Sequence, residues 1–251
     1  MIDTVNRLDS LAGVVILAGG ASSRMGTPKA ELILPTGERL IDYHVRHALN
    51  LNTPIMIADN GRGFCVESAL KVSNSQASII HIADYGADHV DGQNSNSQID
   101  TGGALVAIES ALQTMVNTYL SDALVKKQSS WLLVISCDSL ISATDLWQKL
   151  QSSAMQATDS QATESETTDS QAVDKKVICL TDDSHLYPLL GLYQLSVESD
   201  LKAYIDRGGR RVMQFIKPIV QAVPFEKNWQ HLTNFNTPEE FKRAYMALTD
   251  L

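Results

Sequence analysis

Cysteine is scarce in this sequence, and its scarcity excludes two kinds of scaffold. Cys65, Cys137 and Cys179 are the only cysteines in 251 residues; their number is odd, and no two of them form a CxxC pair. A disulfide framework or a thiolate zinc site needs cysteines at more regular spacings. This usage is typical of a reducing compartment, so we expect the chain to work in the cytoplasm.

Long apolar runs and an excess of positive charge are lacking as well. The apolar run at residues 11–18 follows Asp3 and Asp9, and it is too short for a signal peptide or a membrane span. The chain carries 20 Lys and Arg residues against 29 Asp and Glu residues, a net charge of -9. Such a surface repels nucleic acid and anionic membranes, so we expect neither as a partner.

The rest of the sequence alternates short apolar runs with segments of helical spacing. Apolar residues recur at helical spacing from Ile41 to Leu49 and from Leu105 to Met115. This alternation predicts βαβ units and therefore an α/β fold with a Rossmann-like, three-layer, mostly parallel sheet. The runs expected to form buried strands are residues 14–17, 55–58, 78–82, 131–136 and 177–180.

Two polar segments interrupt this pattern. Residues 88–97 are rich in Asn, Gln and Ser, and residues 152–171 consist almost entirely of Ser, Thr, Gln, Ala and acidic residues. Neither composition can build a core. We predict one domain over residues 1–251, with a disordered polar insertion at about 152–174.

In open parallel sheets, ligands bind beyond the carboxyl ends of the strands. That rule points to the loop after Leu17, where residues 17–29 read Leu-Ala-Gly-Gly-Ala-Ser-Ser-Arg-Met-Gly-Thr-Pro-Lys. The glycines let backbone N–H groups approach a polyphosphate, and Arg24 and Lys29 offset its charge. The alternative is an ordinary glycine-rich turn with two solvated cations. The segment is neither a Walker A loop nor a dinucleotide fingerprint.

A second candidate lies at the end of the apolar run 131–136. Asp138 follows this run, at a position where a carboxylate can hold a hard cation that also takes phosphate oxygens. The alternative is that Asp138 caps the helix expected near Asp145. The residues themselves leave the two roles equally open.

The pattern Leu-Ala-Gly-Gly-x-x-x-Arg-Met-Gly-x-x-Lys resembles the signature of the MobA-like nucleotidyltransferases. Residues 131–139, 208–215 and 234–240 are similar to further segments of the molybdenum cofactor guanylyltransferases within that family. The resemblance implies a glycosyltransferase-A-like fold, as in nucleotide-diphospho-sugar transferases. It also implies Mg²⁺-dependent transfer of GMP from GTP to the terminal phosphate of the molybdopterin cofactor, with pyrophosphate as the second product.

The resemblance assigns a role to each candidate residue. Catalysis falls to Arg24, Lys29 and Asp138, metal binding to Asp138 and Asn236, and acceptor binding to Arg210 and Arg211. Asn236 could instead belong only to a helix start, since Thr237 and Pro238 form an N-cap and a first turn. The Arg pair could be a solvated face. Nucleotide binding falls to Leu17, Ala18, Gly19, Gly20, Lys29, Asn60, Asp84, Gly103 and Asp138.

One departure leaves the base in doubt. The family pattern Asn-Ala-Asn-Arg is Ala58-Asp59-Asn60-Gly61 in this chain. Transfer from CTP or to another phosphorylated acceptor, and a non-catalytic cofactor carrier, therefore stay as alternatives. Apo-molybdoenzymes or their chaperones are the partners that the resemblance implies. The six histidines show no ligand spacing, and we assign them no role.

Overall fold

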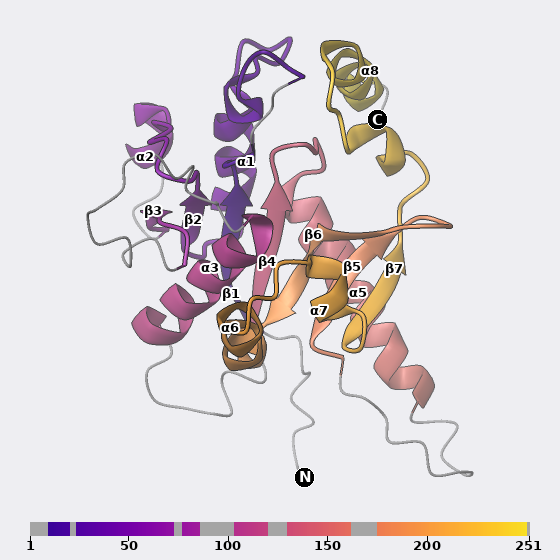
Figure 1. Ribbon diagram of the computed structural model, residues 1–251. Helices are drawn as coiled ribbons and strands as arrows, with labels where there is room; N and C mark the ends of the chain where they lie inside the picture. Colours follow the sequence, from indigo (N-terminus) through magenta and orange to yellow (C-terminus); the bar gives the residue numbers. More distant parts are fainter. Residues whose placement is uncertain are drawn as a thin grey trace.

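A twisted, seven-stranded sheet forms the centre of the molecule (Figure 1). The computed structural model describes residues 10–20, 24–72, 77–85, 103–119, 130–161 and 175–249. The strand order is β3-β2-β1-β4-β6-β5-β7. The strands are β1 (Ser10–Leu17), β2 (Ile55–Ala58), β3 (Ile79–Ile82), β4 (Ser130–Ser136), β5 (Val177–Thr181), β6 (Leu186–Gln194) and β7 (Val220–Pro224).

The predicted mostly parallel α/β sheet is confirmed, with two further strands, β6 and β7. Strands β1 to β4 run parallel to one another, and β7 runs parallel to β5. Strand β6, which the sequence pattern did not predict, is antiparallel to both of its neighbours, β4 and β5. It follows β5 through a short turn at residues 182–185, so the two strands form a hairpin.

Helices cover both faces of the sheet (Figure 1). Side chains from α1, α5 and α8 pack in one core, whereas those from α3, α6 and α7 pack in the other. Consecutive residues of one strand point into opposite cores, as Val14 and Val15 of β1 do. The helices are α1 (Leu40–Leu49), α2 (Ser68–Val72), α3 (Gly103–Tyr119), α5 (Ala143–Gln161), α6 (Glu198–Asp206), α7 (Val212–Ile216) and α8 (Pro238–Thr249).

The polar segments lie only partly within the described residues. Helix α5 extends to Gln161, so residues 152–161 are helical where the composition predicted the start of an insertion. The rest of that segment, 162–174, and the polar segment 88–97 lie outside the described residues. Among the helices that the structure describes, none has the length and apolar character needed to cross a membrane.

The carboxyl ends of four parallel strands meet at one edge of the sheet. Leu17 at the end of β1 pairs with Ala58 of β2 and with Ser136 of β4, and Ala58 pairs with Ile82 of β3. The chain stays hydrogen-bonded just beyond this edge, because the Cys137 amide donates to the Leu17 carbonyl at 3.1 Å. The predicted loop and Asp138 therefore leave the sheet side by side.

Candidate active site

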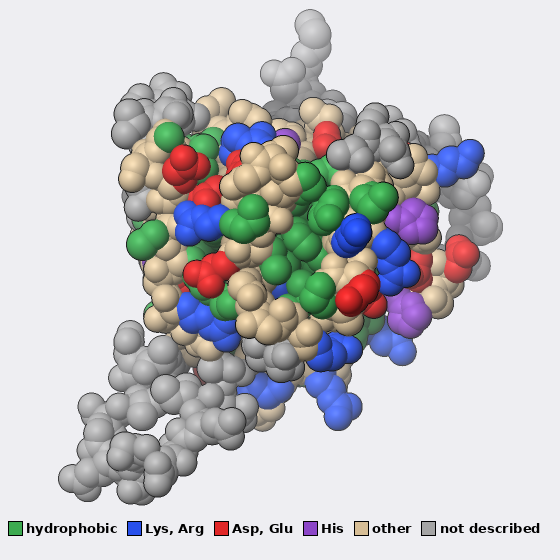
Figure 2. All heavy atoms as spheres, turned by 90° about the horizontal axis from the view of Figure 1, so that it is seen from above, with side chains coloured by type: hydrophobic (Ala, Val, Ile, Leu, Met, Phe, Trp, Pro, Cys, Tyr) green, Lys and Arg blue, Asp and Glu red, His purple; other side chains and the backbone are tan. Residues whose placement is uncertain are grey.

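A cavity of about 410 Å³ opens at this edge of the sheet. Figure 2 looks down on the same edge, where hydrophobic side chains gather at the centre of the face and Lys and Arg side chains surround them. The cavity brings together every residue predicted to bind nucleotide or metal. These residues are Leu17, Ala18, Gly19, Gly20, Arg24, Lys29, Asn60, Asp84, Gly103, Asp138 and Asn236.

The loop after β1 packs against the turn after β2. A Cβ atom at Gly19 would lie 3.1 Å from the Asn60 Cβ atom, so only glycine fits there without displacement. Asn60 has φ 56°, a left-handed conformation that Asn tolerates better than most residues. The Arg62 guanidinium donates to the Gly20 carbonyl at 3.1 Å. These contacts hold the glycine backbone at the cavity wall.

Buried Asp59 organises the turn that carries Asn60. Its carboxylate accepts hydrogen bonds from the backbone amides of Gly61 at 3.1 Å and Phe64 at 3.0 Å. Asp84, which follows β3, lines the cavity and is about half buried. Burial and the negative charge of Asp59 raise the pKa of Asp84. The cavity thus holds a partly desolvated acidic group well suited to accept hydrogen bonds.

Asp138, Lys29 and Asn236 form a polar cluster in the cavity. The Lys29 ammonium group lies 3.4 Å from Asp138 Oδ2 and donates to Asn236 Oδ1 at 2.9 Å. Ser136 donates to the other carboxylate oxygen of Asp138. The side chains of Lys29 and Asp138 are 16% and 27% exposed. An oxygen of Asp138 and an oxygen of Asn236 thus both contact the Lys29 ammonium group.

Asp138 does not cap the helix that follows it, so that alternative is wrong. Helix α5 begins at Ala143, and the Asp145 amide donates to the Ser142 hydroxyl at 3.1 Å. Ser142 is therefore the cap residue. This leaves the Asp138 carboxylate available to the cavity.

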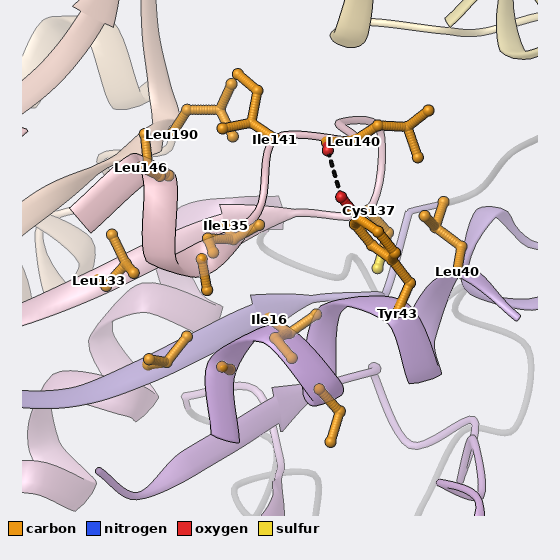
Figure 3. Close-up of a cluster of buried hydrophobic side chains, with 14 of the residues drawn as sticks. Ile16, Leu40, Tyr43, Leu133, Ile135, Cys137, Leu140, Ile141, Leu146 and Leu190 are labelled. Atoms are coloured by element: carbon orange, nitrogen blue, oxygen red, sulfur yellow. Dashed lines mark hydrogen bonds between the residues drawn. The ribbon is translucent and has the colours of Figure 1, made fainter. Parts of the chain in front are cut away.

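Helix α1 supports the loop that carries Asp138 from below. The Tyr43 hydroxyl donates to the Leu140 carbonyl at 2.8 Å within the apolar core (Figure 3). Its neighbour His44 is fully buried, and burial lowers the pKa of this histidine to about 4, so the ring is neutral. On the other side, the Leu140 amide donates to the Leu232 carbonyl at 2.7 Å. The loop is therefore fixed from two sides.

Asn236 stands two residues before Pro238, the first residue of α8. The predicted helix start is confirmed: the Glu240 amide donates to the Thr237 hydroxyl at 3.2 Å, and the Glu240 carboxylate accepts from the Thr237 amide at 3.2 Å and from the Asn236 amide at 2.6 Å. This reciprocal pair is a capping box. It fixes the backbone of Asn236 while the side-chain oxygen faces Lys29. A helix start and a place in the cluster are therefore compatible.

Comparison with known proteins identifies the family. The model of the MobA-like NTP transferase domain matches residues 14–222. The chain belongs to this family. A molybdenum cofactor guanylyltransferase from Yersinia pestis is 26% identical over 230 residues, which cover 90% of this chain and 91% of that protein. The corresponding protein of Yersinia pseudotuberculosis gives the same values.

Solved structures support the fold of this MobA-like nucleotidyltransferase. Molybdopterin-guanine dinucleotide biosynthesis protein A from Archaeoglobus fulgidus superimposes with a TM-score of 0.58 at 19% identity, covering 95% of this chain and 100% of that one. A 2-C-methyl-D-erythritol 4-phosphate cytidylyltransferase from Francisella tularensis gives 0.52 at 12% identity, with 95% and 100% coverage. The predicted nucleotide-diphospho-sugar transferase fold is confirmed.

Arg210 and Arg211 do not join the other predicted site residues in the MobA-like cavity. The Arg210 guanidinium donates to the carbonyls of Ile205 and Gly209, each at 2.8 Å, at the end of α6. Arg211 precedes α7 and is followed by Val212, which lines a neighbouring cavity. The predicted acceptor role of the Arg pair stays a prediction.

The sequence pattern missed part of the nucleotidyltransferase cavity. Within the part of the chain that the structure describes, no group of three or more His, Cys, Asp or Glu side chains is placed to hold a metal. Burial raises the pKa of the Cys137 thiol, which keeps the thiol protonated. This residue therefore packs in the core and does not act as a nucleophile. The other unpredicted lining residues are small or apolar for the most part: Met25, Ala58, Ala104, Ala107, Ser136 and Leu189.

Proposed function

We propose that the protein transfers GMP from GTP to the terminal phosphate of the molybdopterin cofactor, with release of pyrophosphate. The observation that carries this proposal is the cluster of Lys29, Asp138 and Asn236 in one cavity with the glycine-rich loop. The family is one of NTP transferases, and curated relatives of this chain are named molybdenum cofactor guanylyltransferases. The acceptor phosphate is already ionised at neutral pH, so the attack needs no general base.

The glycine-rich loop and its cations receive the triphosphate. Backbone amides at Gly19 and Gly20 can donate to phosphate oxygens, because no side chain intervenes. Arg24 and Lys29 then offset the charge that develops on the departing pyrophosphate. Lys29 contacts Asp138, so phosphate oxygens would compete with this carboxylate for the ammonium group.

Asp138 and Asn236 are the residues that would hold Mg²⁺. An oxygen of each side chain lies within 3.4 Å of the Lys29 ammonium group, and Mg²⁺ commonly takes one or two carboxylates besides phosphate oxygens and water. When bound, the ion would neutralise charge on the transferred phosphoryl group. The Ser136 hydrogen bond orients the Asp138 carboxylate for this purpose.

Base recognition is assigned to Asp84, Asn60 and Gly103. Guanine presents N–H donors on the edge that carries its exocyclic amino group, and an Asp carboxylate accepts such donors. Asp84 lies in the cavity with its carboxyl group partly desolvated. Ala58 lines the same cavity where the family pattern has Asn, and this difference favours CTP as the second candidate nucleotide.

The proposal also includes a cytoplasmic location and proteins that receive the product. All three cysteines are free thiols, which supports the predicted reducing cytoplasm. Delivery of the product to apo-molybdoenzymes or their chaperones stays a prediction from the family role. A carrier without catalysis has no use for the pairing of Lys29 with Asp138 beside a phosphate site.

Pyrophosphate release from each of the four NTPs tests the proposal. The assay contains Mg²⁺, with and without molybdopterin cofactor. We expect release only from GTP and only when the acceptor is present. Release from CTP would keep the chemistry and change the substrate, whereas no release from any NTP would contradict the proposal.

A further inference from the structure

A second cavity, of about 510 Å³, adjoins the first. The two cavities share Ser136, Asp138 and Leu189, and the second extends further over the start of β6 and over the turn after β5. A ligand in each would therefore meet at Asp138. The other residues of the second cavity are His185, Leu186, Tyr187, Pro188, Leu190, Val212 and Asn234.

The chemistry of this lining differs from that of the first cavity. No Lys or Arg is among its described lining residues, and apart from Asp138 at the junction none carries a carboxylate. The rest of the lining is aliphatic, aromatic or polar, and it includes the imidazole ring of His185. Such a surface suits an uncharged ring system and is unfavourable for a second phosphate.

Tyr187 is held in position before any ligand arrives. Its hydroxyl donates to Asp182 Oδ2 at 2.6 Å, and its ring meets that of Phe225 edge-on, with centroids 4.7 Å apart. Burial and the Asp182 contact raise the pKa of Tyr187 to about 12, so it is neutral. Asp182 also accepts from the backbone amides of Ser184 at 2.8 Å and His185 at 2.6 Å. The turn and the aromatic ring are thus fixed together.

We infer that this second cavity binds the body of the acceptor, with His185 and Tyr187 as the residues that determine acceptor specificity. The part of the acceptor assigned to this cavity is its fused pterin ring system, which is joined to the terminal phosphate. The heterocycle packs against Tyr187, and the phosphate reaches the junction at Asp138, where the nucleotide's α-phosphate also lies. The inference rests on the proposed function and names the residues that select its acceptor.

Steady-state kinetics of single variants tests the assignment. We expect Tyr187→Ala and His185→Ala to raise KM for molybdopterin cofactor, Tyr187→Ala by about tenfold, which is what loss of one stacking contact typically costs. KM for GTP should stay within about twofold, a shift too small to represent a lost contact. Tyr187→Phe should keep most of the affinity, because the ring remains. His231→Ala, at an exposed histidine outside both cavities, is the matched control.

The opposite pattern would overturn the inference. Unchanged acceptor KM in both alanine variants would do so, as would an equal rise in KM for GTP. If Tyr187→Ala misfolds because it loses the Phe225 contact, His185→Ala still decides, since its side chain is 75% exposed.

Hydrogen exchange on the wild type separates this inference from the proposed function. We expect molybdopterin cofactor alone to protect the peptide covering residues 182–190, and GTP with Mg²⁺ to protect residues 17–20 instead. Protection of 182–190 without any turnover would support the cavity assignment while contradicting the proposed transfer. Turnover without protection of 182–190 would overturn the cavity assignment alone.

Discussion

The two cavities meet at Asp138 but recognise ligands by different means. The first is lined by adjacent glycines and by the cations Arg24 and Lys29, whereas the second is lined by aliphatic and aromatic side chains with no Lys or Arg among its described residues. In an acidic chain with a net charge of -9, cations placed on one side of the junction attract the triphosphate to that side. On the proposed assignment, charge selects the nucleotide and shape selects the acceptor.

Removal of the Lys29 charge should give the largest effect and confine it to the first cavity. Lys29→Met should lower kcat/KM for GTP on the order of a hundredfold or more, since the ammonium group contacts the cluster where charge develops. Lys242→Met, at an exposed position on α8, is the control. Full turnover by Lys29→Met would contradict the proposal that the charge of the first cavity binds the triphosphate.

Glu109 lies in α3, the helix whose first turns line the first cavity, and it should make the stability of the protein depend on pH. Its side chain is fully buried with no hydrogen-bond partner among the described residues, and burial together with Glu198 raises its pKa to about 8. Because the pKa of Glu109 is raised above its ordinary value of 4.5, protonated Glu109 favours the folded state at low pH. This contribution to the free energy of unfolding is lost as the pH rises through about 8.

Urea unfolding of Glu109→Gln at pH 5 and pH 8.5 measures this effect. We expect the variant to be more stable than wild type at pH 8.5, by on the order of a few kcal/mol, and to show a smaller loss of stability between the two pH values. Equal pH dependence in both proteins would show that Glu109 has a partner when folded. Glu239→Gln, at an exposed site in α8, controls for a general charge effect.

Tyr43 supports the junction itself, so its loss should affect both cavities equally. Tyr43→Phe removes the buried hydrogen bond to the Leu140 carbonyl and should cost about 1–2 kcal/mol in the free energy of unfolding. We expect kcat to fall several-fold, with KM for GTP and for the acceptor nearly unchanged. A change in one KM alone would mean that the loop supports one cavity only. Tyr245→Phe, outside both cavities, is the control.

Arg210 and Arg211 test whether charge also contributes to acceptor binding. Their substitution should have the smallest effect of the variants considered. Arg211→Ala should raise KM for the acceptor by only about two- to threefold, as for a solvent-exposed charge contact. Arg210→Ala should act mainly on stability, because its guanidinium already bonds two backbone carbonyls. A loss of acceptor affinity above about tenfold in Arg211→Ala would show that charge also selects the acceptor.

The first cavity could be predicted from sequence because its residues follow strands directly. The glycines after β1, Asp84 after β3 and Asp138 after β4 each stand at the carboxyl end of a recognisable apolar run. Parallel pairing then brings these ends together without further information. The helix start after Asn236 was specified by Thr237 and Pro238, whereas the place of Asn236 in the site was implied by the family resemblance.

The second cavity could not be predicted, because strand β6 carries signals against a strand. Pro188 and Gly191 interrupt it, and both weaken a strand reading. The structure needs Gly191, since a Cβ atom there would lie 2.6 Å from the Ile178 carbonyl oxygen. Without β6, nothing in the sequence places His185 and Tyr187 near Asp138. The contacts that build this cavity depend on tertiary pairing.

Mass spectrometry of the reaction product tests the central claim most directly. Wild type and Asp138→Asn are incubated with GTP, Mg²⁺ and molybdopterin cofactor, and the acceptor is analysed for added GMP. The account predicts the guanine dinucleotide with wild type and at least a hundredfold less of it with Asp138→Asn. Undiminished product from Asp138→Asn, or an acceptor that wild type leaves unmodified, would contradict it.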